Sequence, residues 1–129
     1  MCFRWAIALL ATWPLAAHHD QAVLFDTSKP TTLKGVVTKV EWHNPHAVLH
    51  IDVKGVSWLV QIASPSTLKH EGVTRDSFLS GETAVEVYLA KDGAKLADGR
   101  EGGTLTLASG KKVKLPIWSA AGKSIVLKK

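Results

Sequence analysis

Residues 33–62 read LKGVVTKVEWHNPHAVLHIDVKGVSWLVQI, and this stretch decides the fold because three strands and two short turns can be recognised in it. The middle strand is the clearest. From His46 to Lys54, apolar and polar residues alternate, which is the period-two pattern of a half-buried strand. One face is expected to carry Ala47, Leu49, Ile51 and Val53. The other face is expected to carry His46, Val48, His50, Asp52 and Lys54.

A further strand is predicted on each side of this one. Leu33–Trp42 is rich in β-branched residues, and one of its faces is expected to carry Val36, Thr38, Val40 and Trp42. His43-Asn44-Pro45 predicts a turn, because proline has no N–H to donate and keeps the preceding residue extended. After a turn at Gly55, Val56–Ile62 is expected to form a third strand that carries Trp58 and Val60.

The remainder of the chain predicts a helix and more strands. Ser64 followed by Pro65 is a typical helix start, and Gly72 ends what must be a short helix. A capped turn at Thr74–Phe78 precedes a strand over Thr83–Ala90, whose core face is expected to carry Val85, Val87 and Leu89. The polar stretch Lys91–Gly103 is expected to be a long loop. A hairpin should follow, formed by Thr104–Ala108 and Lys112–Ile117 across Ser109-Gly110.

This order of elements predicts an all-β fold with one short helix, a five- to six-stranded barrel of the oligonucleotide/oligosaccharide-binding (OB) type. An open β-sandwich is the alternative, and the helix between the strands favours the barrel. The loops at His43–Pro45 and Lys91–Gly103 are then expected to flank a possible ligand face.

The first 17 residues have the pattern of a secretory signal peptide. Arg4 supplies a positive charge, Trp5–Trp13 is free of charge, and small residues precede His18. The apolar run is shorter than the roughly 20 residues of a membrane-spanning helix. We expect cleavage after Ala16 or Ala17, which also removes the single cysteine, Cys2. Residues 18–129 would then form one domain, periplasmic or secreted, without a membrane span.

The net charge of the 129 residues is +5, from 16 Lys and Arg against 11 Asp and Glu. The lysines are scattered and no basic stripe with interleaved aromatic residues is present, so the charge indicates a solvated surface and not a nucleic-acid partner. A single cysteine excludes an internal disulfide framework and a cysteine-rich zinc module. No nucleophile elbow, His-Glu-x-x-His sequence or phosphate loop is present, so we expect a non-enzymatic protein, and a monomer.

Several short motifs along the chain resemble one family of small exported bacterial proteins, the domain-of-unknown-function family 6152. The most specific is Trp42-His43-Asn44-Pro45-His46, which has the form Trp-x-Asn-Pro-His. The resemblance extends over roughly residues 18–93 and includes His18-His19, Phe25-Asp26, Lys29-Pro30, Leu33–Val37, Ser64–Ser66, Thr74–Ser77 and Ala90–Gly93. The resemblance implies export and a common fold, and it implies no particular activity.

Two adjacent histidines, His18 and His19, stand at the expected mature amino terminus. After a cut at Ala17, the free amine and imidazole of His18 would chelate Cu(II), with His43 or His46 completing the site. After a cut at Ala16, His19 is third from the amine, which suits square-planar Cu(II) or Ni(II). The alternative is a frayed tail without a metal.

The turn between the first two strands supplies a second candidate site. Trp42, Asn44 and His46 combine an aromatic ring with polar groups, as small-molecule sites do. The structural alternative is that Asn44 and His46 bond to the backbone of the turn while Trp42 covers the barrel end. His46 and His50 would lie about 13 Å apart along a strand, too far to share a metal. We therefore expect a binding or accessory module for a small ligand or polypeptide. A structural subunit that docks on an envelope protein through an exposed strand or Ile117-Trp118 is the other alternative.

Overall fold

The alternation at the middle strand is present in the structure. A computed structural model describes residues 21–115, 117–118 and 124–125. In chain order its elements are α2 (Gln21–Leu24), β1 (Thr31–Glu41), β2 (Val48–Val53), β3 (Val56–Gln61), α3 (Pro65–His70), the 3-10 helix η1 (Arg75–Phe78), β4 (Glu82–Leu89), β5 (Leu96–Gly99), β6 (Thr104–Thr106), β7 (Lys112–Lys114), β8 (Ile117–Trp118) and β9 (Ser124–Ile125). Ala47, Leu49 and Ile51 are fully buried, as predicted, because their side chains all point to the core-facing side of the sheet.

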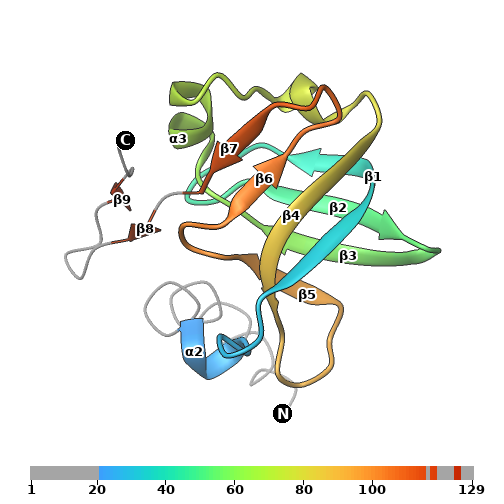
Figure 1. Ribbon diagram of the computed structural model, residues 1–129, viewed down its shortest axis with the longest axis vertical. Helices are drawn as coiled ribbons and strands as arrows, with labels where there is room; N and C mark the ends of the chain where they lie inside the picture. Colours follow the sequence, from blue (N-terminus) through green and yellow to red (C-terminus); the bar gives the residue numbers. More distant parts are fainter. Residues whose placement is uncertain (1–20, 116, 119–123, 126–129) are drawn as a thin grey trace, which may run out of the picture.

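Five strands close into a barrel (Figure 1). β1, β2 and β3 form an antiparallel meander, β3 pairs in parallel with β5, and β5 pairs with β4. The barrel closes where β4 pairs with β1, from Thr31 opposite Val87 to Val36 opposite Glu82. The predicted OB-type order is therefore confirmed and the open sandwich is wrong, because the pairing of β1 with β4 leaves neither strand as an open edge there.

The predicted faces of the first strand are wrong in part. The core side of β1 is formed by Leu33, Gly35, Val37 and Val40, whereas Val36 is 50% exposed and Thr38 is exposed. The pairing with β2 shifts between Val37 and Lys39, and such a bulge inserts one residue and changes which side chains face inward. Trp42 follows the strand and is not part of it.

The stretch Lys91–Gly103 is not one long loop, because it contains β5. Ala97 is fully buried at the centre of this strand, and its neighbours pair with β3 on one side and β4 on the other. The strand was not recognised because its polar residues and single inward alanine give no apolar pattern. The loop between β4 and β5 is therefore only residues 90–95.

The two short helices after β3 contribute to the core at one end of the barrel (Figure 1). Ser64 caps α3 by accepting a hydrogen bond from the Thr67 N–H, which confirms the predicted helix start. Thr74 and Ser77 form the capping box of η1. Leu68 and Phe78 are buried, so both short elements are held by apolar burial.

At the opposite end of the view in Figure 1, the segment after α2 docks on the end of β4. Phe25 is fully buried there and forms an isolated bridge with Ala90. The hairpin β6–β7 extends the sheet beyond β4, and both strands are shorter than predicted. In the part of the chain that the structure describes, no helix has the length and apolarity needed to cross a membrane.

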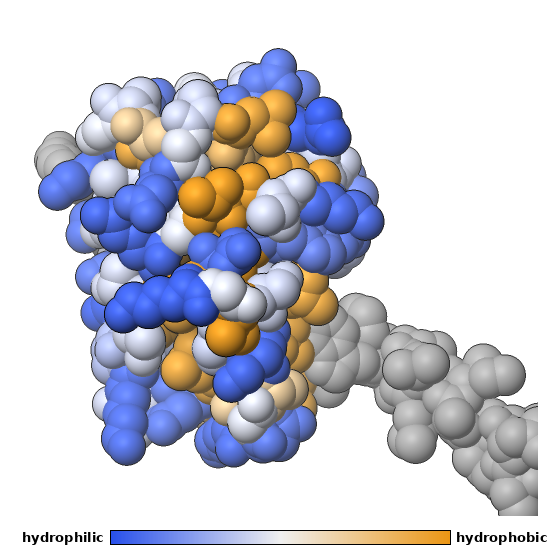
Figure 2. All heavy atoms as spheres, turned by 90° about the vertical axis from the view of Figure 1, so that its right-hand side faces the viewer, coloured by the Kyte–Doolittle hydropathy of each residue, from blue (hydrophilic) through white to orange (hydrophobic). Residues whose placement is uncertain are grey.

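Figure 2 shows one face of the molecule, on which apolar side chains are interspersed with many hydrophilic ones. The large apolar side chains gather instead inside the barrel, where Leu49, Ile51, Val60, Val85 and Leu105 are each fully buried. Burial of this set is the main force that holds the strands in place.

Candidate functional site

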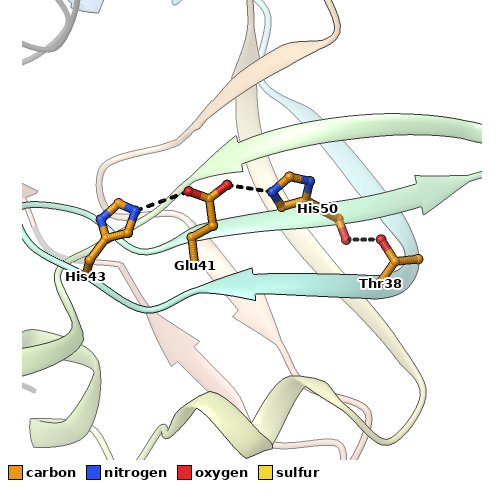
Figure 3. Close-up of polar contacts among 4 residues, drawn as sticks. All are labelled: Thr38, Glu41, His43 and His50. Atoms are coloured by element: carbon orange, nitrogen blue, oxygen red, sulfur yellow. Dashed lines mark hydrogen bonds and ion pairs between the residues drawn. The ribbon is translucent and has the colours of Figure 1, made fainter.

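The loop between β1 and β2 carries side chains to two different surfaces. Glu41 and His43 lie with His50 on the outer face of the sheet, and Figure 3 shows the Glu41 carboxylate between the two imidazole rings. Trp42 and Asn44 instead meet α3. Successive residues of an extended chain point to opposite sides, so this division follows from the extended backbone that leaves β1.

On the outer face, Glu41 accepts two hydrogen bonds. Nε2 of His50 lies 2.6 Å from Oε2 of Glu41, and Nε2 of His43 lies 3.2 Å from Oε1. The bond from His50, and then that from His43, lowers the pKa of the Glu41 carboxyl below its ordinary value of 4.5. The Thr38 hydroxyl donates to the carbonyl of His50 at 3.3 Å, so the bulged part of β1 is also tied to β2.

His46 is an anchor of the loop. Its Nδ1 lies 3.0 Å from the carbonyl oxygen of Ile62, at the end of the neighbouring strand. Beside it, the Ala47 N–H donates to Ala63 and the Ile62 N–H donates to Ala47, which joins the loop to the segment that enters α3. The Asn44-Pro45 peptide bond is cis. His46 thus bonds to the backbone of Ile62 after β3, and not to the backbone of the turn as the structural alternative expected.

A hollow of about 430 Å³ opens between this loop and α3. It is lined by Trp42, Asn44, Pro65, Ser66, Lys69 and His70, and we call it the Trp42 hollow. Its volume falls within the range of roughly 300–1,000 Å³ typical of small-molecule sites. Both of its walls are fixed, because the loop is bonded to Ile62 and Ala63 and the helix is capped by Ser64.

Comparison with models of known protein families shows to which family the chain belongs. The family model described as "Family of unknown function (DUF6152)" matches residues 7–101, well over half of the sequence. The chain belongs to this family. Comparison with curated proteins and with solved structures finds no significant match to either. The family predicted from the short motifs is thus confirmed, and the matched range includes β1 to β5, the loop at Trp42 and α3.

The structure of this DUF6152 member brings together only part of the ligand site predicted from its sequence. Trp42 and Asn44 line the same hollow, whereas His46 bonds to Ile62 and does not line it. The β4–β5 loop, residues 90–95, contributes no residue to the hollow, and its Lys95 carbonyl accepts a hydrogen bond from the Leu59 N–H within β3. Lys69 and His70 line the hollow and were missed, because only the packing of α3 against the loop brings them there.

The predicted copper site stays a prediction. His18 and His19 lie outside the residues that the structure describes. His43 pairs with Glu41. Among residues 21–115, 117–118 and 124–125, no group of three or more His, Cys, Asp or Glu side chains is arranged to hold a metal. The contact of Glu41 with His50 was also not predicted, since the two residues are nine positions apart and no local sequence pattern indicates that they meet.

Proposed function

We propose that the protein is an exported, periplasmic binding module without enzymatic activity, and that it holds a small ligand in the Trp42 hollow. The observation that carries this proposal is the meeting of Trp42 and Asn44 with α3 around one open volume. An aromatic ring supplies apolar contact, and a small number of polar groups orients the ligand, which is the usual composition of such a site.

The fixed walls of the hollow support this function. The loop that carries Trp42 and Asn44 is held by hydrogen bonds on two sides, from His50 to Glu41 and from His46 to Ile62. The opposite wall is the first and last turns of α3, whose Leu68 is buried in the core. A site that is already formed loses little conformational entropy when a ligand binds, which favours affinity.

Export rests on the first 17 residues, whose charge, apolar run and small residues are those of a signal peptide. Expression of the full chain in a bacterium, followed by intact-mass measurement of the periplasmic protein, tests this part. We expect the mass of a chain whose first residue is Ala17 or His18. A full-length protein that stays with the membrane fraction would contradict export.

The binding function is tested on the same purified protein. Native mass spectrometry is expected to show an added mass that disappears under denaturing conditions. Ser66 is exposed and lines the hollow, so Ser66→Trp is expected to fill it and remove the added mass. The matched control is Ser57→Trp, at an exposed position of β3 that does not line the hollow, and this variant should keep the added mass.

The outcomes separate the classes of function. An added mass that survives in Ser66→Trp would place the ligand elsewhere and overturn the proposed site. A retained protein chain, instead of a small molecule, would favour the structural-subunit alternative.

A further inference from the structure

The Trp42 hollow has an unbalanced charge. Lys69 and His70 supply a cation and an imidazole from the last turn of α3, and Asn44 and Ser66 supply an amide and a hydroxyl as hydrogen-bond donors. Of the described residues that line the hollow, none is acidic. Glu71 follows His70 directly, but it does not line the hollow.

The positive charge of Lys69 is not compensated within the described part of the chain. The ion pairs found there join Lys34 to Glu82, Arg100 to Glu86, and Glu41 to its two histidines. Lys69 forms no ion pair with any of these described residues, and the side chains of Asn44, Ser66 and His70 form no hydrogen bond with them. Donors that have no partner among the described residues are free to bind a ligand.

The arrangement of the loop keeps its own carboxylate away from the hollow. Glu41 precedes Trp42, but its side chain is held on the outer face by His43 and His50. The chain thus separates its acidic and basic groups on the two sides of one loop. An anion that enters the hollow therefore meets Lys69 without competition from Glu41.

From this charge distribution we propose that the Trp42 hollow binds a small organic anion, a carboxylate or a phosphate, that carries a planar apolar group. This inference rests on the proposed function and names its ligand class. The anionic group contacts the Lys69 ammonium, with Asn44 and Ser66 as neutral donors, because a hydrogen bond from a charged donor to an anion is stronger than a neutral one. The apolar group contacts Trp42 and Pro65.

The experiment compares five probes that share or lack each feature: benzoate, phenyl phosphate, benzyl alcohol, benzylammonium and acetate. Binding is followed by the NMR shifts of the backbone amides of residues 42–44 and 66–70 at low salt. We expect both aromatic anions to shift these amides. Benzyl alcohol and acetate should each bind at least about tenfold more weakly, and benzylammonium should not bind.

Variants of two exposed lysines test whether the charge of Lys69 is responsible for anion binding. Lys69→Met is expected to weaken benzoate and phenyl phosphate about tenfold and to leave benzyl alcohol unchanged, whereas Lys69→Arg should retain anion binding. Lys114→Met on β7 removes an equal charge from an exposed position outside the hollow, so it should change nothing beyond a small general effect. The comparison of benzoate with phenyl phosphate shows which anionic group the hollow binds more tightly.

Failure of the anion inference can be distinguished from failure of the proposed function. If benzyl alcohol binds as well as benzoate, or if Lys69→Met binds anions normally, the hollow remains a ligand site but the anion inference is wrong. If no probe of any charge shifts these amides and no ligand is retained by the exported protein, the proposed function fails as well.

Discussion

Nε2 of His50 on β2 lies 2.6 Å from Oε2 of Glu41, the last residue of β1. The two residues stand on neighbouring strands in pairs that are two steps apart in one register, with Lys39 opposite His50 and Glu41 opposite Val48, so their side chains share one face of the sheet. Their contact holds the end of β1 at the point where the chain turns toward the Trp42 hollow. The position of Trp42 thus depends on an interaction on the other side of the loop.

The Glu41 bridge predicts a pH-dependent contribution to stability. Its pKa is lower in the folded protein than the ordinary 4.5, so its contribution is present above about pH 4.5 and is lost as the pH falls through the folded value. Glu41→Gln is expected to lower the free energy of unfolding by about 1 kcal/mol at pH 6, a modest effect for a partly exposed pair. Urea denaturation at steps from pH 3 to 6 should show the difference between the two proteins shrink below pH 4.5.

Glu82→Gln is the matched control for this prediction. The Glu82 carboxylate is more exposed and lies 3.8 Å from an exposed Lys34, so its loss should have little effect at any pH in this range. An equal loss in both variants would show that the Glu41 bridge contributes nothing specific.

The bulge in β1 predicts different roles for two adjacent valines. Val37 is 6% exposed and packs in the core, whereas Val36 is 50% exposed. Val37→Ala is expected to lower the free energy of unfolding by about 2 kcal/mol, from lost apolar burial and a small cavity. Val36→Ala should change it by less than about 0.5 kcal/mol. Chemical denaturation of both variants measures this, and a larger loss at Val36 would contradict the register of β1.

Gly35 is predicted to be the least replaceable residue of β1. A Cβ atom built there would lie 2.0 Å from the carbonyl oxygen of Asp52 on β2, so the two strands approach too closely for any side chain. Gly35→Ala is expected to cost about 3 kcal/mol. Thr32→Ala, at an exposed position of the same strand, is the control and should melt like the parent protein. Equal thermal midpoints for the two variants would contradict this close packing.

The chemistry of His18 and His19 makes a separate prediction about the mature terminus. A protein that begins at Ala17 or His18 is expected to bind one Cu(II) tightly through its free amine and an imidazole. Acetylation of the terminal amine should weaken binding at least about tenfold, because it removes that nitrogen as a ligand in either form, whereas an added methionine would again place His18 or His19 third from a free amine. Isothermal titration with Cu(II) measures both forms, and equal affinities would exclude a terminal-amine site.

Much of the fold could be predicted from the sequence where the signal is local. The buried face of β2 follows from the strict alternation at Ala47, Leu49 and Ile51, and the start of α3 follows from Ser64-Pro65. β5 could not be predicted in this way, because Ala97 is its one buried residue and its neighbours are stabilised by pairing with β3 and β4. Closure of the barrel depends on that pairing between distant segments.

The residues of the candidate site also fall into those that the sequence could predict and those that it could not. Trp42 and Asn44 could be chosen from the sequence, because an aromatic and an amide in a turn between strands are typical of a binding loop. Lys69 and His70 could not, since they belong to a helix whose position is set by the burial of Leu68.

By itself, the sequence determined where most strands and the helix begin, which side chains of β2 face inward, and which family the chain belongs to. Only the tertiary structure decided that Glu41 contacts His50 and that Trp42 and Lys69 line the same hollow. The physical reason is the range of the interactions. Alternation and capping act between residues a few positions apart, whereas these contacts depend on strand register and helix packing across the whole barrel.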